Sequence, residues 1–144
     1  MLILMAMTGS GQNGTGFEPT PQPVHPILLS VADGDVWMII QVYFVAVIVA
    51  PLVEETVFRG MLYRQLRSAT ASMRVVWSVT VSTLVVSVIF AALHPQGLVA
   101  IPALASLAIG MSLMREWRGS LAGSMMMHAC NNGIMITMMV LLFS

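Results

Sequence analysis

One stretch of ten residues decides how this chain folds: Pro51-Leu52-Val53-Glu54-Glu55-Thr56-Val57-Phe58-Arg59-Gly60. It places two adjacent carboxylates and a guanidinium inside an otherwise apolar segment. Ionisable side chains at membrane depth are costly, and by default they indicate a functional site with polar partners. The stretch therefore predicts a membrane-spanning helix whose charged residues face polar groups on other helices.

The composition around this stretch is that of a membrane protein. The 144 residues are 58% hydrophobic and only 8% charged, and their mean hydropathy is +0.89. A soluble domain carries roughly 25% charged residues. The net charge is +0 and there is no basic tract, so we expect the lipid bilayer as a partner and no nucleic acid. The single Cys130 excludes an intrachain disulfide.

Apolar runs separated by polar turns predict an all-α, integral membrane bundle of about four transmembrane helices. About 20 apolar residues suffice to cross the hydrocarbon core. The polar connections at residues 64–74 and 115–118 carry five of the six arginines, and the positive-inside rule places these connections on the cytoplasmic side of the cell (cytoplasmic) membrane. The predicted spans are residues 36–66, 75–93, 98–113 and 120–143.

The first 35 residues differ from the rest of the chain. Residues 1–7 are apolar but too short to span a membrane, and residues 8–26 have the Gly-, Gln-, Asn-, Thr- and Pro-rich composition of a linker. We interpret residues 1–7 as the end of a longer helix, in a fragment or a shortened relative of a larger protein. The predicted division is an N-terminal apolar stub and polar linker at 1–35 and a transmembrane domain at 36–144.

The two carboxylates of the central stretch are not equivalent. Glu55 and Arg59 are four residues apart on one helix face, which is a good spacing for an ion pair. Glu54 points about 100° away from Glu55. Two carboxylates in different surroundings have separated pKa values, as acid and base roles require. The alternative is a structural Glu55–Arg59 staple with Glu54 as a spectator.

Candidate partners for Glu54 lie on two other predicted helices. His94 follows Phe90 by four residues at a helix end, and His128 and Asn132 are four residues apart on the last helix. Each pattern alone also fits a purely structural role. His94 fits a helix-capping residue, and His128 and Asn132 fit interhelical hydrogen bonds worth about 1 kcal/mol.

The rise per residue of a helix gives the depth of each of these groups in the membrane, measured from the arginine-bearing connections. Glu54 and His128 each lie ten residues from an arginine of a polar connection, or roughly 15 Å, and Asn132 lies roughly 21 Å in. His94 is twenty residues from Arg74, or roughly 30 Å. Either the segment around Arg74 projects beyond the membrane, or the break at Pro95 lets the His94 end fold back inward.

Together, three motifs resemble those of the CPBP intramembrane protease family, which includes CAAX prenyl endopeptidases and bacteriocin-processing or immunity proteins. The resemblance covers roughly residues 45–135, and it departs in length, because family members usually have further spanning helices before the glutamate pair. The motifs are Glu54-Glu55-x-x-x-Arg59, Phe90-x-x-x-His94 and His128-x-x-x-Asn132.

The resemblance implies an intramembrane endopeptidase that cleaves a peptide or a membrane-protein substrate near the cytoplasmic face. It implies that Glu54 is the general base and that His94 holds the same water and passes a proton to the leaving amine. It also implies that His128 and Asn132 donate hydrogen bonds to the oxyanion. Glu55, paired with Arg59, would fix the helix.

Other chemistries receive less support from the sequence. There is no Gly-x-Ser-x-Gly elbow and no His-Glu-x-x-His pair. We predict no cofactor. Zn²⁺ bound by Glu54, His94 and His128 is the less favoured variant, because no ligand pair has the usual local spacing. Two non-catalytic alternatives stay open, an immunity or scaffold module that retains the polar core and a proton-relaying transporter subunit.

Overall fold

The computed structural model describes residues 36–94 and 96–143, and every regular element in them is a helix. This confirms the all-α prediction. The predicted stub and linker at 1–35 lie outside the described residues. Four helical segments are long and apolar enough to cross a membrane, and they are Val36–Ala69, Val75–Leu93, Leu98–Arg118 and Ala122–Leu142.

The first span is one continuous helical run with two wider, π-helical turns. Pro51, near the start of α4, donates no backbone hydrogen bond and its ring crowds the turn before it, so a locally widened helix there has a clear cause. Glu54 and Glu55 end the short α4, between the two π-helical segments, a feature often found at functional sites. The run consists of α3 (Val36–Phe44), η1 (Val45–Val49), α4 (Ala50–Glu55), η2 (Thr56–Leu62) and α5 (Tyr63–Ala69).

The other spans match the predicted number, but two predicted boundaries were wrong. α5 continues to Ala69 and α7 continues to Arg118, where polar connections were expected. Arginine side chains can extend toward the aqueous interface from a continuing helix, and they suit its C-terminal turn. α7 ends at Gly119, whose φ of 62° is the left-handed conformation common after helices. The remaining elements are α6 (Val75–Leu93), η3 (Leu98–Ala100), α7 (Ile101–Arg118) and α8 (Ala122–Phe143).

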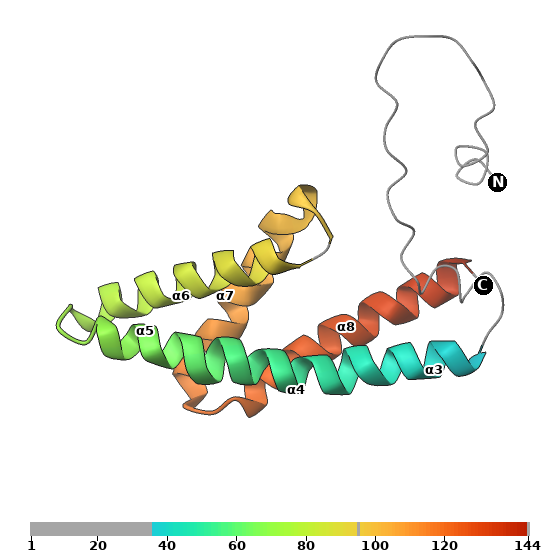
Figure 1. The fold of residues 1–144 in the computed structure, drawn as a ribbon, viewed down its shortest axis with the longest axis horizontal. Helices are drawn as coiled ribbons and strands as arrows, with labels where there is room; N and C mark the ends of the chain where they lie inside the picture. Colours follow the sequence, from blue (N-terminus) through green and yellow to red (C-terminus); the bar gives the residue numbers. More distant parts are fainter. Residues whose placement is uncertain (1–35, 95, 144) are drawn as a thin grey trace, which may run out of the picture.

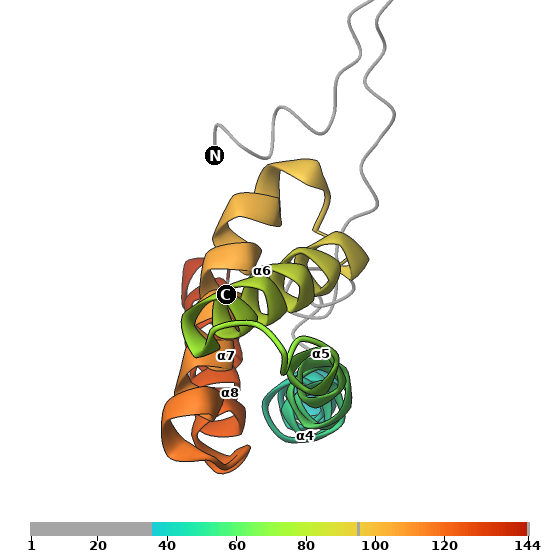
Figure 2. The ribbon, with the colours of Figure 1, turned by 90° about the vertical axis from the view of Figure 1, so that its left-hand side faces the viewer.

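The spans pack so that α6 and α8 both reach the middle of the first span. α6 packs mainly on α7 and also contacts α5 and η2, while α8 contacts α7, α4 and η1. Figure 1 shows α6 and α8 beside the long first helix, with the α5–α6 and α7–α8 turns toward the same end of the molecule. Viewed from that end in Figure 2, α6 lies between α5 and α7.

An interfacial cluster of Tyr63, Arg67, Ser78 and Glu116 fastens three helices together at the end that carries these turns. Arg67 Nη2 lies 3.1 Å from Glu116 Oε1, and Arg67 Nη1 donates to the hydroxyl of Ser78. Tyr63 Oη donates to Glu116 Oε2 at 2.9 Å. The cluster therefore fixes α5 against both α6 and α7.

We expect Glu116→Ala to lower the free energy of unfolding by about 1–3 kcal/mol, the usual cost of leaving buried hydrogen-bonding groups without partners. The fully buried Tyr63 loses its acceptor and Arg67 loses its carboxylate. Unfolding in mixed SDS micelles, followed by circular dichroism, measures the change. Arg64→Ala on the same helix, where Arg64 is exposed, is the control and should change stability by less than about 0.5 kcal/mol. Equal effects of the two substitutions would contradict the role of the cluster.

Candidate active site

The predicted ion pair between Glu55 and Arg59 is present, and it is completely buried. Arg59 Nη1 donates to Glu55 Oε1 at 2.8 Å, and both side chains are 0% exposed. Arg59 Nη2 donates to the carbonyl of Ala108 on α7 at 3.0 Å. The guanidinium carbon lies 4.7 Å from the ring centroid of Phe90 on α6, within cation–π range. Arg59 thus joins η2 to both α6 and α7.

Glu55 has a second partner that the sequence analysis missed, since His128 Nδ1 on α8 lies 3.0 Å from Glu55 Oε1. An ionised carboxylate only accepts hydrogen bonds, so Nδ1 is the protonated nitrogen that donates. Nε2 of His128 is thereby directed away from Glu55. Spacing within one helix indicated the Glu55–Arg59 pair, but no sequence spacing indicates a contact between residues 73 positions apart.

Glu54 faces two histidines, as predicted. Its Oε2 lies 3.7 Å from His94 Nε2 and 3.8 Å from His128 Nε2. The side chain of Glu54 is 31% exposed, yet its Oε2 atom is buried and has no hydrogen-bond partner within the described part of the chain. These separations exceed a direct hydrogen bond. They fit groups that share one water, since two contacts of about 2.8 Å can join atoms that far apart.

His94 reaches this position without folding back. α6 is a continuous helix from Val75 to Leu93, and because α5 runs on to Ala69, the α5–α6 turn lies beyond the level of Arg64. The structure therefore fits the alternative in which the segment around Arg74 extends further. No inward break before Pro95 is needed.

The aromatic ring of Phe90 contacts both imidazoles. The rings of Phe90 and His94 have centroids 4.1 Å apart, and those of Phe90 and His128 are 5.7 Å apart in an edge contact. His94 Nδ1 lies 2.7 Å from the carbonyl oxygen of Phe90. Since a carbonyl only accepts, Nδ1 donates there and Nε2 of His94 faces Glu54.

Asn132 lies one helical turn after His128 but is engaged elsewhere. Its Nδ2 donates to the carbonyl of Ala46, in the π-helical segment η1, at 2.8 Å. In residues 36–94 and 96–143, no hydrogen bond joins Asn132 to Glu54, His94 or His128. The structure thus brings together three of the four predicted catalytic residues, and the oxyanion role of Asn132 stays a prediction. Asn132 also holds α8 against the first span.

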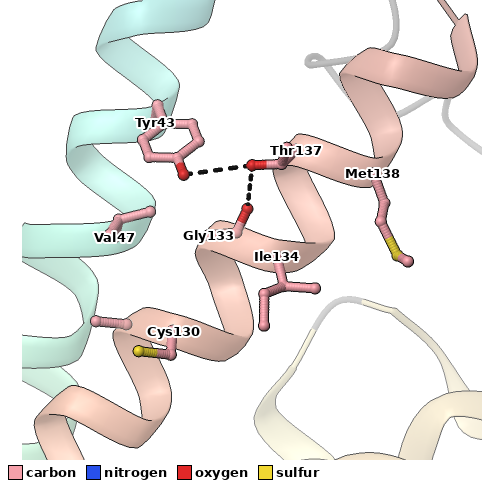
Figure 3. Close-up of a pocket in the computed structure, with 8 residues that line it drawn as sticks. Tyr43, Val47, Cys130, Gly133, Ile134, Thr137 and Met138 are labelled. Atoms are coloured by element: carbon pink, nitrogen blue, oxygen red, sulfur yellow. Dashed lines mark hydrogen bonds between the residues drawn. The ribbon is translucent and has the colours of Figure 1, made fainter.

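Cys130 lies apart from these groups. It is exposed and lines an apolar pocket of about 450 Å³ between the first span and α8, with Tyr43, Val47, Gly133 and Ile134 among its neighbours. Figure 3 shows this pocket, with the Tyr43 hydroxyl directed at Thr137 across Gly133. None of the predicted catalytic residues lines it.

The zinc variant at Glu54, His94 and His128 stays a prediction. Within the described residues, no group of three or more His, Cys, Asp or Glu side chains is arranged to hold a metal ion.

The charges of the site suit proton transfer. Glu54 and Glu55 supply two negative charges and Arg59 supplies one positive charge, so with neutral imidazoles one negative charge remains. Glu55 and Arg59 compensate each other inside the bundle, and the charge that remains belongs to the partly exposed Glu54.

Comparison with known proteins identifies the family. A family model described as type II CAAX prenyl endopeptidase Rce1-like matches residues 36–134. The matched region contains Glu54, Glu55, Arg59 and the residues on α6 and α8 that face them. Searches of curated proteins and of solved structures found no match. Because the matched region is more than half of the chain, this protein belongs to the type II CAAX prenyl endopeptidase Rce1-like family.

Proposed function

We propose that this chain is an intramembrane CAAX-type endopeptidase that uses water activated by Glu54 and its two facing histidines. One observation carries the proposal, the convergence of His94 Nε2 and His128 Nε2 on the buried Oε2 of Glu54 at 3.7 and 3.8 Å. A water held there would lie between a carboxylate that can take its proton and two imidazoles that can donate or relay one.

In this mechanism Glu54 removes a proton from the water while the water oxygen attacks the scissile carbonyl carbon. His94, held by the Phe90 carbonyl, relays the proton from Glu54 to the leaving nitrogen when the C–N bond breaks. In this proposal Nε2 of His94 can receive the proton from Glu54, because Nδ1 donates to the Phe90 carbonyl and leaves Nε2 unprotonated.

His128 would stabilise the tetrahedral oxyanion as an imidazolium. Its Nδ1 proton faces Glu55 Oε1 at 3.0 Å, which fixes the orientation of the ring. Its Nε2–H would then point toward the reacting atoms. Asn132 would be the second donor, because an amide has two N–H groups and only one is needed for the Ala46 carbonyl. Losing one oxyanion donor typically costs about 3 kcal/mol of transition-state stabilisation.

The proposed substrate is a peptide that ends in a prenylated C-a-a-X sequence. The family match supports this choice, and so does the apolar pocket of about 450 Å³, which Ala129 and Cys130 line directly after His128. Pockets of roughly 300–1,000 Å³ accept small apolar ligands. In this proposal the arginine-bearing ends of α5 and α7 face the cytoplasm, and cleavage occurs near that face of the cytoplasmic membrane.

The test is cleavage by the purified full chain in lipid nanodiscs. We expect a synthetic peptide with a farnesylated C-a-a-X end to release a C-terminal fragment that mass spectrometry identifies, with EDTA present or absent. Release that EDTA abolishes would contradict the metal-free mechanism. If neither the prenylated nor the unmodified peptide releases a fragment, the proposed activity is contradicted.

A further inference from the structure

Three buried serine hydroxyls, together called the buried serine group, have no hydrogen-bond partner in the described part of the chain. They are Ser82 and Ser87 on α6 and Ser112 on α7, with exposures of 0%, 1% and 0%. An unpaired buried polar group costs about 1–3 kcal/mol, and lipid offers no partner. The described residues therefore leave these three hydroxyls without the partner that burial calls for.

The positions of the group follow from hydrogen bonds on either side of it. On α7, Ala108 accepts from Arg59 and Glu116 accepts from Arg67. Ser112 is four residues from each, so it lies on the same face of α7, between the active site and the interfacial cluster.

The same order holds on α6. Ser78 contacts Arg67 at the interfacial cluster, and Phe90 lies against Arg59 at the active site. Ser82 and Ser87 occur between Ser78 and Phe90, so along α6 they lie at levels between the interfacial cluster and the active site, about 140° apart around the helix.

The part of the bundle between the active site and the interfacial cluster has polar groups at both ends. At the active-site end, Arg59 Nε and Glu55 Oε2 are also buried without a hydrogen-bond partner in the described residues. At the other end, Arg67 and Ser78 line a pocket of about 350 Å³ at the α5–α6 turn. This pocket could hold several water molecules, which occupy about 30 Å³ each in the liquid.

We propose that the buried serine group binds a chain of internal water molecules that runs from the pocket at the α5–α6 turn to Glu55 and Arg59. Internal waters typically make about three hydrogen bonds to otherwise unpaired polar groups, which is what these atoms lack. Water is the second substrate of peptide hydrolysis, and this chain would supply it to the site inside the membrane. This supply role rests on the proposed hydrolytic function. The binding of the waters does not.

Dry packing is the competing explanation, since serine lets membrane helices approach closely. X-ray radiolytic labelling in H₂¹⁸O of the full chain in nanodiscs separates the two, because hydroxyl radicals form where water is bound. We expect the fully buried Tyr63 and Met111 to take up ¹⁸O faster than Met135, which faces outward on α8. Labelling of Tyr63 and Met111 no faster than that of Met135 would overturn the proposal.

The double variant Ser87→Ala/Ser112→Ala should reduce labelling of Tyr63 and Met111 to the rate of Met135. The matched control is Ser106→Ala on α7, whose exposed hydroxyl already donates to the Pro102 carbonyl at 2.8 Å, and it should leave labelling unchanged. Fast labelling that the double variant does not reduce would also overturn the proposal, because the serines would then not hold the waters.

Turnover provides the separate test of supply. In a protein that cleaves the prenylated peptide, the double variant should lower kcat and leave KM unchanged, whereas Ser106→Ala should change neither. An unchanged kcat with reduced labelling would overturn the supply role alone. A wild-type protein that is labelled as expected but cleaves nothing would contradict the proposed function and leave the water binding intact.

Discussion

Glu54→Gln is expected to reduce the rate of peptide cleavage by at least about 100-fold, the lower end of what a positioned general base contributes. Glutamine has nearly the same shape but cannot take a proton from water. We expect the fold to survive, because Glu54 is partly exposed and its Oε2 accepts no hydrogen bond from the described residues. Fragment release from the prenylated peptide, measured together with the unfolding curve, tests both expectations.

Glu54→Asp is the matched control, because it keeps the carboxylate on a side chain that is one methylene shorter. It should retain more activity than Glu54→Gln. Full cleavage by Glu54→Gln would exclude the catalytic role and favour an immunity or scaffold module. Proton flux into liposomes without any proteolysis would instead favour a relay through the same carboxylate.

Much of the fold could be predicted because the signals are local. Four apolar runs of sufficient length dictate four helices, and the four-residue spacing of Glu55 and Arg59 dictates their ion pair. The helix ends at Ala69 and Arg118 could not be predicted as well. An arginine is compatible with either a turn or the last turn of a helix, and composition does not distinguish these.

Contacts between helices were predicted only where the three motifs pointed to them together. Glu54 does face His94 and His128, but the contact between Glu55 and His128 was missed. Asn132 bonds to Ala46 within a π-helical turn. As with Glu55 and His128, no spacing within the sequence indicates a contact between residues 86 positions apart.

The shared histidine changes how the carboxylate pair is understood. Glu55 is more than the counter-charge of Arg59, because the same oxygen that accepts from Arg59 also accepts from His128. His128 in turn faces Glu54 through its other nitrogen. Arg59, Glu55, His128 and Glu54 therefore form one connected series of polar contacts, from the buried ion pair to the partly exposed Glu54.

Arg59→Met should destabilise the protein by about 3–5 kcal/mol, the usual loss when one partner of a buried ion pair is removed. Methionine fills much of the space, so the loss reports the charge left on Glu55, which is 0% exposed. Part of the cost should be offset by a proton on His128, which contacts the same carboxylate oxygen. Unfolding in mixed SDS micelles measures the change.

The double variant Glu55→Gln/Arg59→Met separates charge from packing. It removes both charges, so we expect it to recover most of the lost stability, because neutral replacements of a buried pair are often tolerated. Arg64→Met, at an exposed position on the same helical run, should cost less than about 0.5 kcal/mol. If the double variant is as unstable as Arg59→Met alone, the stability comes from the hydrogen bond to Ala108 and the contact with Phe90 instead of the ion pair. Because Glu55 also orients His128, the double variant should still fold but cleave slowly, which distinguishes the structural role of this carboxylate from its role in positioning the histidine.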